Sequence, residues 1–399
     1  MEDNMVIVGG GIGGLAAALA CGRDGAFGPR GPSLRLVEQA PAFGEVGAGV
    51  QLGPNVTRIL HGWGLQQAVA DVAAFPDRLE VRSALSGQLL GTLPLGERAL
   101  AVYGAPYATI ARQDLHALLR QAVESLGGID IDLNTRIASV APVGERVQVL
   151  THDGRELDAS GVLGADGVWS ALRRQLVDDG APRVTGHLAF RAMVPQSDLP
   201  AGVRSQVVTA WMGPHFHAVQ YPVRRGEWLN VVVIVHGTVL GDPSVWDHSA
   251  NAGELRVRLA NAGGPLLDLV HAIDDWRLWA LSDRPPMRSA QDMALGRLAL
   301  LGDAAHPMRP YLAQGAGMAI EDAQQLSLSL RSHAGDMPAG FSHYAAARWQ
   351  RNARVQARAI RNGEIFHLRG PMRMARDVSM KLLGQKLLDV PWLYAYNIS

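Results

Sequence analysis

The feature that most constrains this chain is a glycine-rich turn close to its N-terminus, in the stretch MVIVGGGIGGLA at residues 5–16. Residues 6–8 are β-branched, as expected for a buried parallel strand. The pattern GxGxxG then falls on Gly9, Gly11 and Gly14, and LAAALACGRDG after it predicts a helix. Glycine permits a tight turn, close approach of the backbone to a pyrophosphate, and close packing of helix on strand. The segment therefore predicts a dinucleotide bound at a helix N-terminus.

A second predicted strand supports this interpretation. LRLVEQA, at residues 34–40, brings Glu38 to the strand end, where an acid accepts hydrogen bonds from a ribose. Glu38 lies somewhat further from the glycine turn than the usual spacing of about 20 residues. The Gly- and Pro-rich stretch 23–33 predicts a loop that takes up the excess.

Composition excludes several classes of protein. The 37 basic and 37 acidic residues balance, so no global charge favours nucleic acid or an anionic membrane as a partner. The single cysteine, Cys21, excludes a disulfide framework and a Cys-rich metal site, and we predict no metal. No apolar run reaches the roughly 18 residues of a spanning helix. The first strand begins too early to leave room for a signal peptide, so we expect a cytoplasmic protein.

Two further segments repeat the strand, turn and helix arrangement. Residues 161–173, GVLGADGVWSALR, place Asp166 in a turn between an apolar strand and a helix. In residues 298–323 a strand ends at Asp303, a Pro-containing loop follows, and Gly315-Ala316-Gly317 opens a helix.

These three segments, in this order and at these separations, resemble the single-component FAD-dependent aromatic hydroxylases (class A flavin monooxygenases) over nearly the whole chain. The resemblance implies an α/β fold, with a Rossmann-type FAD-binding domain, a mostly antiparallel substrate sheet and C-terminal helices. The first motif would hold the ADP half of FAD, and the motif at Asp166 would touch both FAD and the nicotinamide. The segment after residue 298 would hold the ribityl and isoalloxazine half. NADH or NADPH would visit transiently, since no second GxGxxG exists.

Smaller matches agree with this resemblance. FGEVGAGVQLGPNVTRIL, at 43–60, looks like the family's segment beside the flavin, and Arg112 matches an arginine that reaches the cofactor. A helix N-terminus at 315–318 would direct positive dipole at the flavin, where reduction places negative charge. The stretches 313–323 and 389–397 are similar to the salicylate, 3-hydroxybenzoate and 6-hydroxynicotinate branch. The predicted cofactor residues are Gly9, Gly11, Gly14, Glu38, Gly49, Val50, Arg112, Asp166, Asp303, Gly315, Ala316, Gly317 and Met318.

The predicted domains are discontinuous. We expect the FAD-binding domain to comprise 1–75, 101–180 and 281–330, the substrate domain 76–100 and 181–280, and a C-terminal helical region 331–399. Within that last region, 343–368 carries basic residues at helical spacing, including Arg348. This pattern favours a solvated or subunit-facing helix over one that binds nucleic acid or a membrane surface. The chain would be a monomer or a homodimer.

Candidate substrate residues come from the predicted sheet. In GPHFHAVQYPV, at 213–223, His217 and Tyr221 are four residues apart and face the same side of a strand. The resemblance implies that a His and a Tyr at this spacing act on the substrate, and a His of ordinary pKa can take a phenol proton. The alternative is a packed histidine with locally satisfied nitrogens. His215 is a weaker candidate, and His306 is expected to be structural.

Three more residues are candidates for contact with the substrate. Arg191 would pair with a substrate carboxylate or brace the domain interface. Pro310 and Tyr311 lie in the loop expected under the reactive edge of the flavin. Tyr311 would either hydrogen-bond the substrate hydroxyl or wall the pocket.

The implied function is hydroxylation of a small hydroxylated aromatic acid, such as salicylate or 3-hydroxybenzoate, by FAD, NAD(P)H and O₂ through a flavin C4a-hydroperoxide. A hydroxylated N-heteroaromatic acid and a larger phenolic or polyketide are alternative substrates. A non-catalytic FAD-fold binding protein is disfavoured, because the flavin-binding segments are intact.

Overall fold

A computed structural model describes residues 4–23, 33–44, 48–238, 241–242, 248–249 and 251–398. Most of the predicted loop at 23–33, and residues 45–47 of the segment expected beside the flavin, lie outside the described residues.

The first sheet has six strands around the predicted N-terminal strand. Its strands are parallel except for the antiparallel edge strand β18. The strand order is β18 (Ala294–Leu295), β19 (Leu298–Leu300), β11 (Gly161–Gly164), β1 (Asn4–Val8), β2 (Ser33–Val37) and β7 (Ile129–Asp132). This is the Rossmann-type arrangement expected from the sequence.

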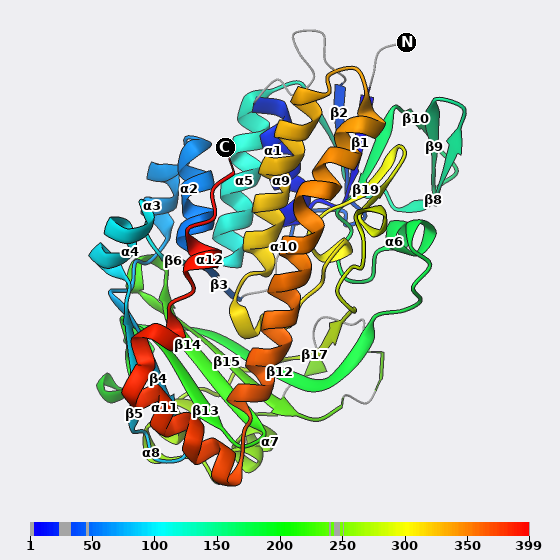
Figure 1. Cartoon of the computed structure of the whole chain (residues 1–399). Helices are drawn as coiled ribbons and strands as arrows, with labels where there is room; N and C mark the ends of the chain where they lie inside the picture. Colours follow the sequence, from blue (N-terminus) through cyan, green and yellow to red (C-terminus); the bar gives the residue numbers. More distant parts are fainter. Residues whose placement is uncertain are drawn as a thin grey trace.

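Long helices cover one side of this sheet (Figure 1). They are α1 (Ile12–Arg23), α5 (Arg112–Leu126), α9 (Gly315–Ser332) and α10 (Met337–Phe366). Helix α1 packs against α5 and α9, and α9 packs against α10. Cys21 is buried in this core. Three antiparallel strands and a short helix flank the same sheet: β8 (Ile137–Val143), β9 (Arg146–Thr151), β10 (Glu156–Ala159) and α6 (Ala171–Leu176).

The second sheet has eight strands and lies below the first in Figure 1. All its neighbouring strands pair antiparallel except β13 and β4. The order is β16 (His248–Ser249), β17 (Arg277–Asp283), β12 (Arg183–Pro195), β15 (Trp228–His236), β14 (Phe216–Val223), β13 (Val208–Gly213), β4 (Arg78–Ser83) and β5 (Leu89–Pro94). The mostly antiparallel substrate sheet is thereby confirmed.

The two faces of this sheet have different environments because side chains alternate along a strand. On one face, Phe190, Ala218 and Val233 belong to a core that includes residues of α7 (Ala252–Arg258) and α8 (Gly264–His271). On the other face, the neighbours of these residues in sequence face a cavity against the first sheet.

Smaller elements connect the two sheets. A two-stranded ladder joins β3 (Gly49–Leu52) to β6 (Ala108–Ala111). The helices beside it are α2 (Pro54–Gly62), α3 (Gln66–Val72) and α4 (Gly96–Tyr103). None of the helices in the described part of the chain combines the length and apolar character that crossing a bilayer requires.

After residue 331 the chain is mainly helical. Helix α10 runs from the first sheet to the second (Figure 1), and α11 (Gly370–Leu388) then packs on β5. Close packing there requires Gly384, since a Cβ at this position would lie 2.9 Å from the Cα of Gly91. The chain ends with α12 (Pro391–Tyr394) and a short tail. We propose that the domains follow the boundaries predicted from the sequence.

Candidate active site

A cavity of about 340 Å³ lies between the two sheets. Its wall combines the glycine turn after β1, the start of α9 and the free face of the eight-stranded sheet. The predicted site residues that line it are Gly11, Gly49, Val50, Arg112, Arg191, His217, Tyr221, Asp303, Pro310, Gly315 and Ala316. The predicted residues that do not line it are Gly9, Gly14, Glu38, Asp166, Tyr311, Gly317 and Met318.

The three motif glycines serve different purposes. Gly9 has φ +109°, and a Cβ there would lie 2.4 Å from the carbonyl oxygen of Ala165. A Cβ at Gly14 would lie 1.9 Å from the carbonyl oxygen of Gly9, so this glycine seats α1 on the turn. A Cβ at Gly11 would meet no atom within 4 Å. Gly11 therefore leaves open space beside a helix N-terminus, which fits the pyrophosphate of a dinucleotide.

Glu38 holds the glycine turn in place. One carboxylate oxygen accepts a 2.6 Å hydrogen bond from the N–H of Gly10, and the other accepts one of 2.8 Å from Ala40. The carboxylate thus lies directly beside the turn, and its contact with a ribose stays a prediction.

The start of α9 and Asp303 form a further part of the cavity wall. Gly315 and Ala316 line the cavity, whereas the N–H of Met318 donates to the carbonyl of Gln314 at 2.8 Å. Gly317 packs on α2, and the Met318 side chain is fully buried. The Asp303 side chain lines the cavity and is accessible from it. Protein atoms surround the cavity, and the resulting desolvation raises the pKa of the Asp303 carboxyl.

Asp166 caps α6 and keeps one oxygen unused. Its Oδ2 accepts hydrogen bonds from the N–H groups of Ala171 at 2.8 Å and Leu172 at 3.4 Å. Its Oδ1 is buried and has no hydrogen-bond partner among the described residues. Burial raises the pKa of this carboxyl. A buried acceptor without a donor is uncommon, and the flavin or nicotinamide contact expected of this motif fits it.

His217 and Tyr221 point to the cavity from the same face of β14, as their spacing predicts. Burial raises the pKa of Tyr221, so its phenol stays protonated at neutral pH. The Nδ1 of His217 lies 2.8 Å from the Nε2 of His367. His217 is not the imidazole of ordinary pKa that the sequence predicts: burial, with the neighbouring His367 and His187, lowers its pKa well below the usual range.

Arg191 also faces the cavity, from β12. Its guanidinium carbon lies 4.6 Å from the ring centroid of Trp279, and its buried Nε has no hydrogen-bond partner among the described residues. Burial lowers its pKa to about 10, so it remains a cation at neutral pH. A desolvated cation with an unused donor suits an anionic ligand.

The two candidates in the loop expected under the flavin, Pro310 and Tyr311, lie in different positions. Pro310 lines the cavity, but Tyr311 lies behind it, with its ring centroid 5.0 Å from that of His217. The buried hydroxyl of Tyr311 has no hydrogen-bond partner among the described residues. His215 does not line the cavity, and its Nε2 lies 3.3 Å from a guanidinium nitrogen of Arg369.

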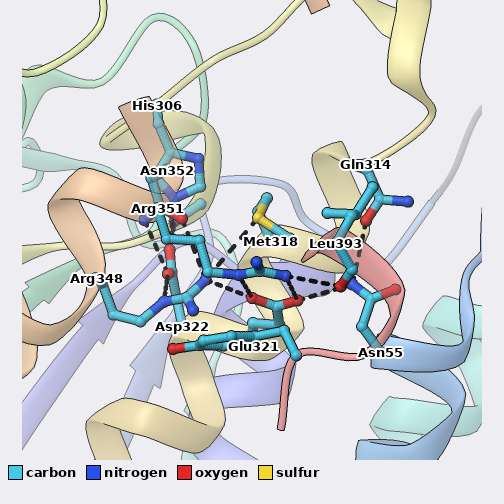
Figure 2. A network of polar contacts seen from close by, with 12 residues as sticks. Asn55, His306, Gln314, Met318, Glu321, Asp322, Arg348, Arg351, Asn352 and Leu393 are labelled. Carbon is cyan, nitrogen blue, oxygen red and sulfur yellow. Dashed lines mark hydrogen bonds and ion pairs between the residues drawn. The ribbon is translucent and has the colours of Figure 1, made fainter. Parts of the chain in front are cut away.

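A buried polar network behind the flavin end was not foreseen (Figure 2). His306 and Arg348 contact Asp322 at 2.5 and 2.8 Å, and Glu321 pairs with Arg348 at 2.8 Å and Arg351 at 2.7 Å. Burial alone would raise the pKa of Asp322, but His306 and Arg348 hold it below its ordinary value. The structural role expected of His306 fits this position.

The prediction of a solvated or subunit-facing basic helix was wrong for Arg348. This side chain is 0% exposed, because the acids of α9 pair with it inside the molecule. Arg361, further along α10, is exposed, as expected of a solvated helix face. The network fixes α9 against α10 and hence positions the helix N-terminus that lines the cavity.

Three contributors to the site were not named as candidates from the sequence. Gln51, in the segment 43–60 expected beside the flavin, accepts a 2.6 Å hydrogen bond from the hydroxyl of Tyr107 and lines the cavity, as does Trp279. His367 reaches His217 from the end of α10. Trp279 and His367 belong to no motif, so only the fold brings them to the site.

The glycine turn fits a pyrophosphate, and ionisable side chains line the adjoining cavity. Together these features define a dinucleotide-dependent enzyme. Residues 2–359 match the family model described as FAD binding domain, and the chain belongs to this family.

Similar proteins span nearly the full length. The chain is 36% identical to the 3-hydroxybenzoate 6-hydroxylase of Polaromonas naphthalenivorans (strain CJ2), over 100% of this chain and 98% of that protein. It is 35% identical to the 6-hydroxynicotinate 3-monooxygenase of Bordetella bronchiseptica, over 89% and 90% of the two chains. A salicylate hydroxylase substrate complex superposes with a TM-score of 0.81 at 25% identity, over 99% of this chain and 96% of that one.

The predicted fold, family and enzyme class are therefore confirmed. The chain is an FAD-dependent aromatic monooxygenase with NAD(P)H as electron donor.

Proposed function

We propose that the chain hydroxylates a small benzoic acid that carries a ring hydroxyl, with 3-hydroxybenzoate as the first candidate. The observation that carries this proposal is one cavity that Arg191, His217 and Tyr221 line from the eight-stranded sheet and that Asp303 lines from the flavin-binding segments. The carboxylate of such a substrate matches the buried cation of Arg191. Its phenol matches the neutral imidazole of His217 and the phenolic hydroxyl of Tyr221. The 3-hydroxybenzoate 6-hydroxylases at 33–36% identity support the same choice.

The size of the cavity favours a single ring. The whole space is about 340 Å³ and also borders Gly11, Asp303 and Gly315, so the cofactor takes part of it. The remainder suits a one-ring acid better than a polyketide. Salicylate and a hydroxynicotinate have the same size, and related proteins carry these names.

Arg191 would bind the substrate carboxylate. It lies on the free face of the sheet, remains cationic and has an unused donor. A charge-assisted hydrogen bond in a desolvated site is short and strong. The ring would then be held with its hydroxyl toward β14.

His217 would accept the phenol proton, and Tyr221 would donate a hydrogen bond to the substrate. The Nδ1 of His217 contacts His367, so Nε2 is the nitrogen left for the ring hydroxyl. A lowered pKa keeps the imidazole neutral before substrate binds, as a base requires. Removal of the proton makes the ring more nucleophilic. FAD, when bound, supplies the activation of O₂ that this ring needs.

Apolar side chains would exclude water from this reaction. Val219, Val232, Ile234 and Trp279 line the cavity around the candidate base. A dry site limits loss of the activated oxygen as hydrogen peroxide.

The test is NADH and NADPH oxidation by purified holoenzyme with 3-hydroxybenzoate, salicylate and 6-hydroxynicotinate. Hydroxylated product and hydrogen peroxide are quantified together. Product equal to the NAD(P)H consumed, for one of these acids, is the expected result. Oxidation that no acid stimulates would contradict the proposal and favour a larger phenol. The cytoplasmic location and the monomeric or dimeric state stay predictions.

A further inference from the structure

A cluster of histidines lies on the cavity-facing side of the eight-stranded sheet, next to Tyr311 and His217. His187 on β12 and His236 at the end of β15 are direct partners on neighbouring strands. His367, just after α10, completes the group. One ring nitrogen from each of the three lies within 4.8 Å of the others, and the Nε2 of His236 is 3.0 Å from the Nδ1 of His367.

We propose that His187, His236 and His367 form a binding site for a divalent first-row transition-metal ion such as Zn²⁺, which acts on hydroxylation through His217. The part that concerns His217 rests on the function proposed above. Three histidines from two strands and a helix end cannot be recognised as a site in the sequence, where no metal was expected.

The donor chemistry fits such an ion. Imidazole is a preferred ligand of Zn²⁺, Cu²⁺ and Ni²⁺, and three histidines with an open fourth position are a known zinc arrangement. Nitrogens bound to one zinc ion at about 2.0–2.1 Å lie about 3.3 Å apart in tetrahedral geometry. The pair from His236 and His367 already approaches this separation.

One of the three histidines lacks a partner. The Nδ1 of His187 is buried and makes no hydrogen bond to any described residue. A buried imidazole nitrogen without a partner is costly, and a metal ion would satisfy it. His236 is exposed, which gives an ion an entry path and leaves room for water as a fourth ligand.

The nearby arginines carry partners of their own. Arg309 pairs with Asp283 at 2.7 Å, and Arg376 pairs with Asp377 at 2.7 Å. Arg369 contacts only the imidazole of His215 among these groups. The carboxylates of Asp283 and Asp377 reduce the repulsion that a bound cation would meet.

Hydrogen bonding carries the effect to the substrate. An ion on the Nδ1 of His367 leaves the proton of that ring on Nε2, which then donates to the Nδ1 of His217. The remaining proton of His217 must then be on Nε2, toward the substrate. In this tautomer His217 donates a hydrogen bond and cannot accept the phenol proton. An occupied site therefore slows hydroxylation.

The test is calorimetric titration of Zn²⁺ into tag-free holoenzyme that has been dialysed against a chelator. We expect one Zn²⁺ per chain, with at least about tenfold weaker binding in His236→Gln and His187→Gln, since even outer partners of metal ligands contribute that much. His236 is exposed, so its replacement is compatible with folding. His343→Gln is the matched control, because His343 forms a ring pair with His333 at 5.0 Å on another part of the surface. Equal affinity in wild type and His236→Gln would overturn the site.

The second measurement is product formed per NADH oxidised, with 3-hydroxybenzoate and added Zn²⁺. In wild type and His343→Gln the ratio is expected to fall and to recover with chelator, whereas in His236→Gln it should not respond to Zn²⁺. Zn²⁺ that binds without changing this ratio would overturn the effect on His217. An enzyme that makes no product even without metal would contradict the proposed function instead, and the calorimetry would still decide the site.

Discussion

Replacing Gly11 by valine is expected to leave the chain folded and to remove most of its capacity to retain FAD. Gly11 does not have a positive φ, and a Cβ there meets no atom within 4 Å, so the substitution costs little in the free protein. The same open space borders the cavity at the start of α1, where we expect backbone N–H groups to bind the pyrophosphate of FAD. Valine would occupy it.

The size of the effect follows from the hydrogen bonds that are lost. A hydrogen bond to a charged group contributes about 1.5–3 kcal/mol. Loss of one or two such bonds therefore costs about 1.5–6 kcal/mol, which raises the Kd for FAD about tenfold to 10⁴-fold.

The assay is the ratio of FAD to protein after gel filtration, followed by titration of FAD into apoprotein. Thermal unfolding of the two apoproteins provides the control for folding. Gly14→Ala is the contrasting variant and is expected to lose the fold, because its Cβ would lie 1.9 Å from the carbonyl oxygen of Gly9. Gly11→Val protein that purifies with a full complement of FAD would refute the assignment of this space to the pyrophosphate.

Four further predictions concern the substrate wall and the buried network. His217→Ala should lower the hydroxylation rate about 10²-fold or more with FAD retained, and an unchanged ratio of product to peroxide would remove His217 from the mechanism. Arg191→Met should raise KM for a hydroxybenzoate more than it lowers kcat; an equal loss with a phenol that lacks a carboxylate would contradict this role. Arg348→Met should reduce the free energy of unfolding by about 3 kcal/mol, the low end of the range for a broken buried ion pair. The loss is limited because Glu321 still pairs with Arg351, and Asp322 still contacts His306. The exposed Arg361→Met should change it by less than about 0.5 kcal/mol, and similar urea midpoints for these two variants would argue against the network. Because the pKa of Asp322 is lower in the folded chain than in the unfolded one, its stabilising contribution is complete above about pH 4 and declines as the pH falls. The difference in free energy of unfolding between wild type and Asp322→Asn, measured in urea, should therefore become smaller as the pH falls. A difference that stays constant down to pH 3 would contradict this prediction.

Local patterns were sufficient for much of the fold and part of the site. The roles of Gly9 and Gly14 depend on atoms within the same motif and its neighbouring strand, so spacing alone predicts them. The shared face of His217 and Tyr221 follows from the two-residue period of a strand. The flavin-binding segments were recognisable because each is a contiguous strand, turn and helix.

Features that depend on distant segments were not predictable in this way. Arg348 looks like a residue of a solvated helix face until α9 places Glu321 and Asp322 against it. Tyr311 follows Pro310 directly, yet the 3-10 turn between residues 310 and 312 puts only Pro310 in the cavity wall. His367 gains its importance from a strand 150 residues away. In each case burial or contact is decided by packing between elements.

Helix α10 links the two ends of the active site mechanically. Arg348 and Asn352 attach it to Asp322 behind the flavin end, and His367 at its far end touches His217. The helix and its C-cap cover the 19 residue steps from Arg348 to His367 in about 28 Å. Helix α10 therefore fixes the distance between the flavin-binding end of the cavity and the candidate base. Any shift of α9 relative to α10 would change the alignment of His217.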